Sequence, residues 1–232
     1  MENETASTVE KDCPRCGKPA ALCICAGIEP IDNRVELLIL QHPQEQDVAL
    51  GTARLTALSL KHATLKIGLS WPSLGKVLGR SVDPKRWAVL YLGSARAPDF
   101  AGHEVALLDR RGEPLADHAA AMAEIEGVIV LDGSWSQAKA LWWRNPWMLK
   151  CRRVVLAPRR PSRYGKLRRE PRSEGLATIE AAGLLLSRLE ARPEIEQALT
   201  RSFERLLERY RAQRRAPRQP ASAANSGPSS AA

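Results

Sequence analysis

Short runs of apolar residues recur along this chain, and each is bounded by polar residues, glycine or proline. They lie at 35–40 (VELLIL), 87–92 (WAVLYL), 128–131 (VIVL) and 154–156 (VVL). Unbroken apolar runs of this length are typical of strands that are buried on both faces of a parallel sheet. We therefore predict four central strands at these positions.

The segments between these runs favour helices. Thr52 and Thr178 are suitable N-cap residues, and Glu180 favours the positive end of the second helix dipole. Predicted helices begin at Thr52 and continue through Leu55, Leu58 and Leu60, cover 114–125, run from Ser134 or Ser136 to before Asn145, run from Thr178 to near Pro193, and cover 201–215. Alternating strands and helices predict an α/β fold, with a mainly parallel sheet and flanking helices.

Length and composition limit the class of protein. At roughly 150 residues per domain, 232 residues allow one catalytic domain with a small appendage. No apolar run approaches the roughly 18 to 20 residues of a membrane span, and the polar start lacks the apolar core of a secretory signal. The sequence therefore predicts a cytoplasmic protein. Its predicted parts are a disordered N-terminus (1–12), a cysteine-rich segment (13–30), a catalytic domain (31–211) and a disordered tail (212–232) that lacks bulky apolar residues.

Positive charge is concentrated in one part of the chain. Lysine and arginine number 35 against 26 acidic residues, a net charge of +9, and the window 150–172 holds ten basic residues and one acidic residue. Such a concentration attracts polyanions through phosphate neutralisation. A solvated basic loop is the alternative interpretation.

Four of the five cysteines fall at Cys13, Cys16, Cys23 and Cys25. In a chain without an export signal, closely spaced pairs favour thiolates on one metal ion over disulfides, and zinc is the expected metal. Four sulfur ligands close the coordination shell, so this zinc would be structural. The alternative is four unrelated buried cysteines. Cys151 is interpreted as a small buried apolar residue.

Asp132 follows a predicted buried strand, and Gly133 and Ser134 come next at a turn into a helix. Ligands of parallel sheets bind beyond the carboxyl ends of the strands, so Asp132 is a candidate reactive group. The alternative is that it only caps the following helix. Trp135 and the Trp142-Trp143-Arg144 cluster are typical of a core, although aromatic faces beside basic residues also stack on nucleobases.

Several separated motifs then occur in a recognisable order: Cys13-x2-Cys16-x6-Cys23-x-Cys25, His42-Pro43-Gln44-Glu45, Thr52-Ala53-Arg54, Asp132-Gly133-Ser134-Trp135, Tyr164 to Pro171, and Thr178-Ile179-Glu180-Ala181. Together they resemble the motifs of DTW-domain proteins, which are tRNA-uridine aminocarboxypropyltransferases of the SPOUT-like superfamily, over residues 13–190. The chain departs from the family pattern at two positions. Ser134 replaces the motif threonine, and Ala177 stands where the family usually has serine.

The resemblance implies transfer of the 3-amino-3-carboxypropyl group from S-adenosylmethionine to N3 of a tRNA uridine, with release of 5'-methylthioadenosine. It implies a SPOUT-like fold with a C-terminal knot that holds the donor. Candidate catalytic residues are Asp132 as general base, Ser134 and Trp135. Candidate donor-binding residues are Leu92, Gly93, Leu131, Gly133, Leu156, Tyr164, Thr178 and Glu180. Candidate contacts to tRNA phosphates are Arg54, Arg159, Arg160, Arg163, Lys166, Arg168 and Arg169.

Two other function classes remain open. A related S-adenosylmethionine-dependent RNA methyltransferase would share the fold and the basic surface, and a zinc-containing RNA-binding protein would need no catalytic acid. His42 and Glu45 either help to place substrate or form an ordinary turn. The sequence does not identify which tRNA position is modified or which tRNAs are used. It also does not distinguish tRNA from ribosomal RNA as the substrate, and it does not give the oligomeric state.

Overall fold

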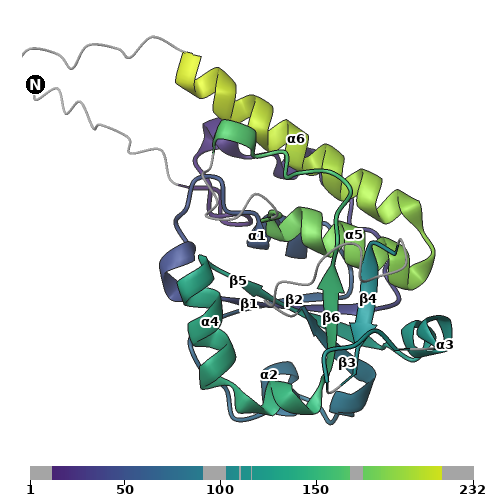
Figure 1. Cartoon of the computed structure of the whole chain (residues 1–232). Coiled ribbons are helices and arrows are strands. Elements are labelled where there is room, and N and C mark those ends of the chain that lie inside the picture. Colours follow the sequence, from purple (N-terminus) through teal and green to yellow (C-terminus); the bar gives the residue numbers. More distant parts are fainter. Residues whose placement is uncertain (1–11, 91–102, 110, 116, 168–174, 216–232) are drawn as a thin grey trace, which may run out of the picture.

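A six-stranded sheet forms the centre of the protein (Figure 1). The computed structural model describes residues 12–90, 103–109, 111–115, 117–167 and 175–215. The strands are β1 (Glu36–Gln41), β2 (Ala63–Ile67), β3 (Trp87–Leu90), β4 (Val105–Leu108), β5 (Gly127–Asp132) and β6 (Arg152–Leu156). They lie in the order β2-β1-β5-β3-β6-β4, and only β4 runs antiparallel to its neighbour. The predicted α/β class with a mainly parallel sheet is confirmed.

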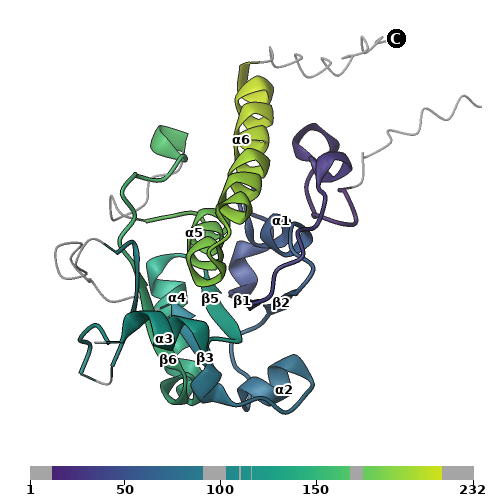
Figure 2. The same ribbon diagram turned by 90° about the vertical axis from the view of Figure 1, so that its right-hand side faces the viewer.

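Helices cover both faces of the sheet (Figures 1 and 2). One face packs against α1 (Ala53–Leu58), α5 (Thr178–Glu190) and α6 (Pro193–Arg215), and the other against α2 (Leu74–Leu78) and α4 (Trp135–Arg144). In β1, Leu37 belongs to the first core and Leu38 to the second. Both faces of the strand are therefore buried, which explains its unbroken apolar run.

The four predicted strands are confirmed, although Tyr91 and Leu92 lie outside the described residues. Two strands were not predicted. β2 lies at one edge of the sheet and is half-exposed, so it lacks a continuous apolar run. β4 lies at the other edge and has only four residues. In β2 the side chains of Ala63 and Leu65 pack on the core, which explains its mixed sequence. β4 is the apolar run VALL with all four residues buried, so it carries the same signal as the predicted strands and was overlooked.

Three predicted helix boundaries were wrong. The helix predicted from Thr52 through Leu60 ends at Leu58. The helix predicted over 114–125 is α3 (His118–Ala123), because Pro114 bridges to Leu108 and Asp117 accepts a hydrogen bond from the amide of Ala120. The final helix begins at Pro193 and not at 201. Pro193 therefore opens α6 in addition to following α5, as expected for a proline in a first helical turn.

The cysteine-rich segment shares the core of the large domain. Leu22 and Ile24 are buried in the same cluster as Phe203 of α6, and Arg205 donates a hydrogen bond of 2.9 Å to the carbonyl of Gly27. At the other end, α6 continues to Arg215, beyond the predicted boundary at 211. Among the residues that the structure describes, no helix is both long and apolar enough to cross a bilayer.

The first turn of α5 is capped from another helix. Ala177 precedes it and has no side-chain acceptor, and the hydroxyl of Thr52 accepts the hydrogen bond of the Ile179 amide at 3.2 Å. Thr52 occupies the predicted N-cap position of α1, but its side chain makes no cap bond there. Thr178 was predicted to cap α5, and that prediction was wrong, because Thr178 is the first helical residue and Ala177 holds the N-cap position. A buried threonine thus ties the start of α1 to the start of α5.

We expect Thr52→Val to lower the free energy of unfolding by about 1 kcal/mol, the usual cost of losing a helix cap. Thr56→Val is the matched control, because the carbonyl of Thr52 that its hydroxyl contacts also accepts the Thr56 amide. Urea unfolding of both variants tests this, with amide hydrogen exchange at Ile179 as the local readout. Equal losses in the two variants would contradict the cap.

Candidate functional site

Asp132 lies at the carboxyl end of β5, where it is buried beside two other elements. One carboxylate oxygen accepts a hydrogen bond of 2.8 Å from the side-chain amide of Gln41, its paired residue at the end of β1. The other accepts a hydrogen bond from the hydroxyl of Thr178, the first residue of α5. Both donors are uncharged, and no ion pair with Asp132 is present among the described residues.

The alternative interpretation, in which Asp132 caps α4, is wrong. Ser134 is the cap residue: its hydroxyl accepts from the amide of Gln137, and the Gln137 side chain accepts from the amide of Ser134 at 2.6 Å. Gly133 permits this turn, because a Cβ there would lie 2.9 Å from the Cβ of Gln137. The Asp132 carboxylate is thereby left for other contacts.

Gln41 is a site residue that sequence reasoning missed. Its amide nitrogen donates to Asp132, and its amide oxygen is buried with no hydrogen-bond partner among the described residues. A buried acceptor without a donor is costly and marks a place where a ligand can supply an N–H group. The signal in the sequence was its position, directly before His42-Pro43 at the end of a predicted strand.

Glu180 joins the start of α5 to the loop that follows β6. Its carboxylate accepts from the amides of Ala177 and Arg163, both at 2.9 Å, and from the hydroxyl of Ser162. The guanidinium of Arg163 lies 3.7 Å from the same carboxylate. Glu180 therefore holds the loop in place through four groups.

The donor-binding candidates that the structure describes fall into two groups. Leu131, Gly133 and Leu156 lie at or just beyond the carboxyl ends of β5 and β6, at one edge of the sheet with Thr178 beside Asp132. Tyr164 is buried against Phe203, and its hydroxyl donates to the carbonyl of Leu50 at 2.7 Å. Leu92 and Gly93 lie outside the described residues.

The arginine candidates also differ in their surroundings. Arg159 and Arg160 are exposed. Arg54 is half-buried with its guanidinium beside Gly17, and Arg163 contacts Glu180 and Glu204. The side chain of Lys166, and all of Arg168 and Arg169, lie outside the described part of the chain.

His42 and Glu45 border the same strand end. The Nδ1 atom of His42 accepts from the amide of Gln44 at 3.3 Å, and the His42 amide donates to the carbonyl of Asp132 at 2.9 Å. Glu45 is buried. The His-Pro turn thus has a structural use. Trp135 is the first residue of α4 and is half-buried.

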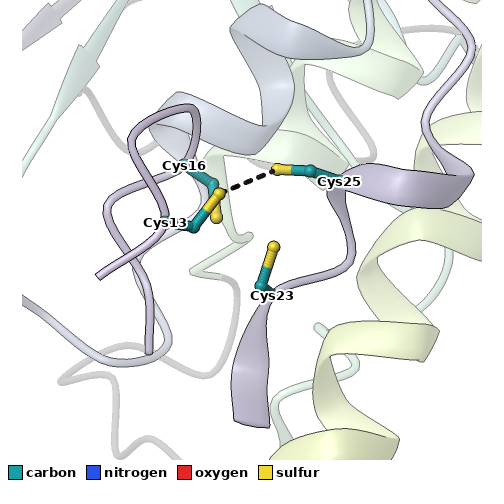
Figure 3. Close-up of side chains that lie close together, drawn as sticks. All are labelled: Cys13, Cys16, Cys23 and Cys25. Carbon is teal, nitrogen blue, oxygen red and sulfur yellow. Dashed lines mark hydrogen bonds between the residues drawn. The ribbon is translucent and has the colours of Figure 1, made fainter. Parts of the chain in front are cut away.

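The four N-terminal cysteines form one cluster (Figure 3). Their sulfur atoms all lie within 4.8 Å of one another, and the sulfurs of Cys13 and Cys25 are 3.9 Å apart. Four sulfurs on one zinc ion lie about 3.8 Å apart, because each Zn–S bond is about 2.3 Å long. The cluster therefore fits a four-coordinate metal ion.

The surroundings affect the cysteines of this cluster differently. The amides of Cys16 and Arg15 lower the pKa of the Cys13 thiol to about 6. Burial raises the pKa of Cys16 and of Cys25, so these two need a cation before they ionise near neutral pH. Gly17 has a φ of 65°, a conformation that glycine adopts readily.

Comparison with known proteins gives one family and several relatives. The family described as the DTW domain matches residues 10–211. Proteins named tRNA-uridine aminocarboxypropyltransferase 2 from Macaca fascicularis and Mus musculus are each 29% identical to this chain over 84% of it and 62% of their own length. The Drosophila melanogaster protein of that name is 29% identical over 84% of the chain and 72% of its own length. The chain thus spans less than two thirds of the macaque and mouse relatives. No solved structure shows a significant match.

We expect Glu180→Gln to lower the free energy of unfolding by about 1 to 3 kcal/mol, since the amide replaces an acceptor oxygen that buried donors use. Hydrogen exchange at the amides of Arg163 and Ala177 should accelerate. Glu204→Gln is the matched control: it removes the other, half-exposed partner of Arg163 and should cost less than about 1 kcal/mol. Unchanged exchange at Arg163 in the Glu180 variant would contradict a scaffold role.

Proposed function

This chain belongs to the DTW domain family, and on that premise we propose that it transfers the 3-amino-3-carboxypropyl group of S-adenosylmethionine to N3 of a uridine in tRNA. The names of the three relatives support this activity. The observation that carries the proposal is the carboxylate of Asp132, which Gln41 and Thr178 hold at the carboxyl end of β5. A carboxylate at this edge of a parallel sheet is placed to meet a ligand.

Asp132 is the proposed general base. The uracil imide becomes nucleophilic when it loses its N3 proton, and Asp132 accepts that proton. Each carboxylate oxygen already accepts one hydrogen bond and keeps capacity for another. N3 then bonds to the γ-carbon of the donor as the bond from that carbon to sulfur breaks, and 5'-methylthioadenosine leaves. S-adenosylmethionine supplies the activated leaving group.

The chain has to select which carbon of the sulfonium reacts, because the methyl carbon is the least hindered. We assign this positioning to the strand ends that carry Leu131, Gly133 and Leu156, beside Thr178. The unpaired oxygen of Gln41 fits an N–H donor, such as the ammonium of the aminocarboxypropyl group. Glu180 and Tyr164 act on the site through the loop that they hold.

We further propose that the fold is SPOUT-like with a knotted C-terminal region, and that 31–211 forms its catalytic domain. The parallel sheet and the meeting of β1, β5 and α5 at Asp132 support this assignment. The exposed Arg159 and Arg160 follow β6 near this edge and are the proposed tRNA phosphate contacts within the described residues.

We propose zinc as the ion of the cysteine cluster. Four thiolates match its preferred ligands and leave no open position for water, so the ion is structural. Because Leu22 and Ile24 of the same segment pack on α6, loss of the ion should also loosen that contact.

The substitution Asp132→Asn tests whether Asp132 acts as a general base or only as a structural residue. The variant should fold, because the Asn oxygen can accept from the Gln41 amide nitrogen and the Asn NH2 can donate to the hydroxyl oxygen of Thr178. Transfer should fall by roughly a hundredfold to ten-thousandfold, the usual effect of losing a general base. Single-turnover formation of 5'-methylthioadenosine, measured with donor affinity, provides the test.

Asp117→Asn is the matched control, since Asp117 caps α3 and should leave transfer unchanged. Transfer by Asp132→Asn at the wild-type rate would overturn the assignment of the base. Formation of S-adenosylhomocysteine by the wild-type protein would instead identify a methyltransferase. Retained tRNA binding without either product would identify a binding protein.

We expect one zinc ion per chain in the wild-type protein and in Cys151→Ala, whose thiol is buried outside the cluster. Cys25→Ala should lose the ion, and hydrogen exchange should increase over residues 13–30 and on the facing side of α6. Metal analysis and hydrogen exchange provide the two readouts. A metal-free wild-type preparation with unchanged protection of residues 13–30 would contradict this prediction.

A further inference from the structure

Trp143 is the most exposed large apolar side chain in the described part of the chain, with 78% of its surface accessible. It lies near the end of α4, while Leu141, two residues earlier, is fully buried in the core beneath the helix. An exposed tryptophan next to a well-packed helix face is unusual, because exposure of such a large ring gives up much hydrophobic stabilisation. Neither the sheet core nor the proposed catalytic centre uses this ring.

The end of α4 adjoins the segment that follows β2. The side chain of Asn145 donates to the carbonyl of Leu69 at 3.0 Å, and the hydroxyl of Ser70 donates to the carbonyl of Arg144 at 3.1 Å. Ile67 and Leu69 are partly exposed there. The surface around Trp143 is therefore built from two segments, one ending α4 and one following β2.

Both of these segments lack acidic residues. The sequence contains no aspartate or glutamate from 48 to 82 or from 133 to 169. Lys139 lies one turn before Trp143 on the same helix face, Arg144 follows it, and both are exposed. No ion pair is formed by either residue with the described part of the protein. The surface therefore combines an exposed ring with uncompensated positive charge.

We propose that Trp143 is a stacking platform for an unpaired base of the RNA substrate, with Lys139 and Arg144 meeting the adjacent phosphates. Stacking on an aromatic ring tolerates every base, and flanking cations neutralise the backbone. This inference rests on the proposed function for the identity of the RNA. It adds a second contact surface to the one at Asp132.

A second copy of this chain is a poorer fit to the surface. A symmetric dimer would bring Lys139 and Arg144 of each copy toward the same residues of the other, and each chain has a net charge of +9. Binding of a polyanion neutralises the positive charge of Lys139 and Arg144, whereas binding of a second copy of the chain adds like charge beside them.

The position of the ring along α4 suits one RNA that occupies both surfaces. Trp135 opens the helix beside Asp132, and Trp143 lies eight residues further on, about 12 Å along the axis at about 1.5 Å per residue. A uridine at Asp132 and an unpaired base at Trp143 would then contact opposite ends of the same helix. α4 would fix the spacing between them.

Binding of unfractionated tRNA to Trp143→Ala, Trp143→Phe and Trp143→Leu tests the proposal in the absence of S-adenosylmethionine. Alanine and leucine should weaken binding by about fivefold to 150-fold, the range that base stacking gives, and phenylalanine should retain most of the affinity. A perfect RNA duplex is the matched ligand, and its affinity should not change in any of the three variants. Lys139→Ala should reduce the salt dependence of tRNA binding by about one unit, and Trp143→Ala should leave it unchanged.

Wild-type affinity of Trp143→Ala for tRNA would overturn the proposal. Rescue by leucine as well as by phenylalanine would also overturn it, because an apolar contact then suffices. If sedimentation shows a dimer that Trp143→Ala dissociates while tRNA affinity stays constant, the surface binds a second copy. Failure of the proposed function is a separate result: the wild-type protein would form no 5'-methylthioadenosine, whatever the Trp143 variants bind.

Discussion

The buried carboxylate of Asp132 sets the requirements that the surrounding structure meets. A buried charge without partners is very costly, so the two neighbouring elements each supply a hydrogen-bond donor, Gln41 from β1 and Thr178 from α5. Thr178 is held in turn because Thr52 caps the helix that it begins. Asp132 thus links the ends of β1 and β5 to the start of α5, and Thr52 links the start of α5 to the start of α1.

The start of α5 also anchors the loop that follows β6, which carries Arg159, Arg160 and Arg163. Glu180 belongs to the first turn of α5, and its carboxylate binds Ser162 and Arg163. This contact limits where the exposed Arg159 and Arg160 can lie, because they precede the anchored residues by only a few positions. The first turn of α5 therefore contacts both Asp132, the proposed general base, and the loop that carries the proposed phosphate contacts.

Charge and aromatic exposure divide the surface in a way that suits an RNA ligand. Residues 133–169 contain no acid, and this stretch begins beside Asp132, passes through α4 and ends in the basic loop. Asp132 directly precedes this stretch. An acid facing RNA weakens binding, so its presence there is consistent with the proposed role as general base. The cysteine cluster lies elsewhere, against α6, where it supports the fold.

The sequence by itself determined the α/β class, the four central strands and the cysteine cluster, because buried strands need continuous apolar runs and metal ligands need close spacing. It also placed Asp132 at a strand end. The edge strand β2 escaped prediction because it is half-exposed and lacks a continuous apolar run, whereas β4 has such a run, VALL, that was overlooked. Only the tertiary structure decided that Thr52 caps α5 and not α1, that Gln41 meets Asp132, and that Trp143 is exposed and Leu141 buried. Each of these depends on contacts between residues far apart in the chain or on which face of a helix meets the sheet, and local sequence patterns do not encode such contacts.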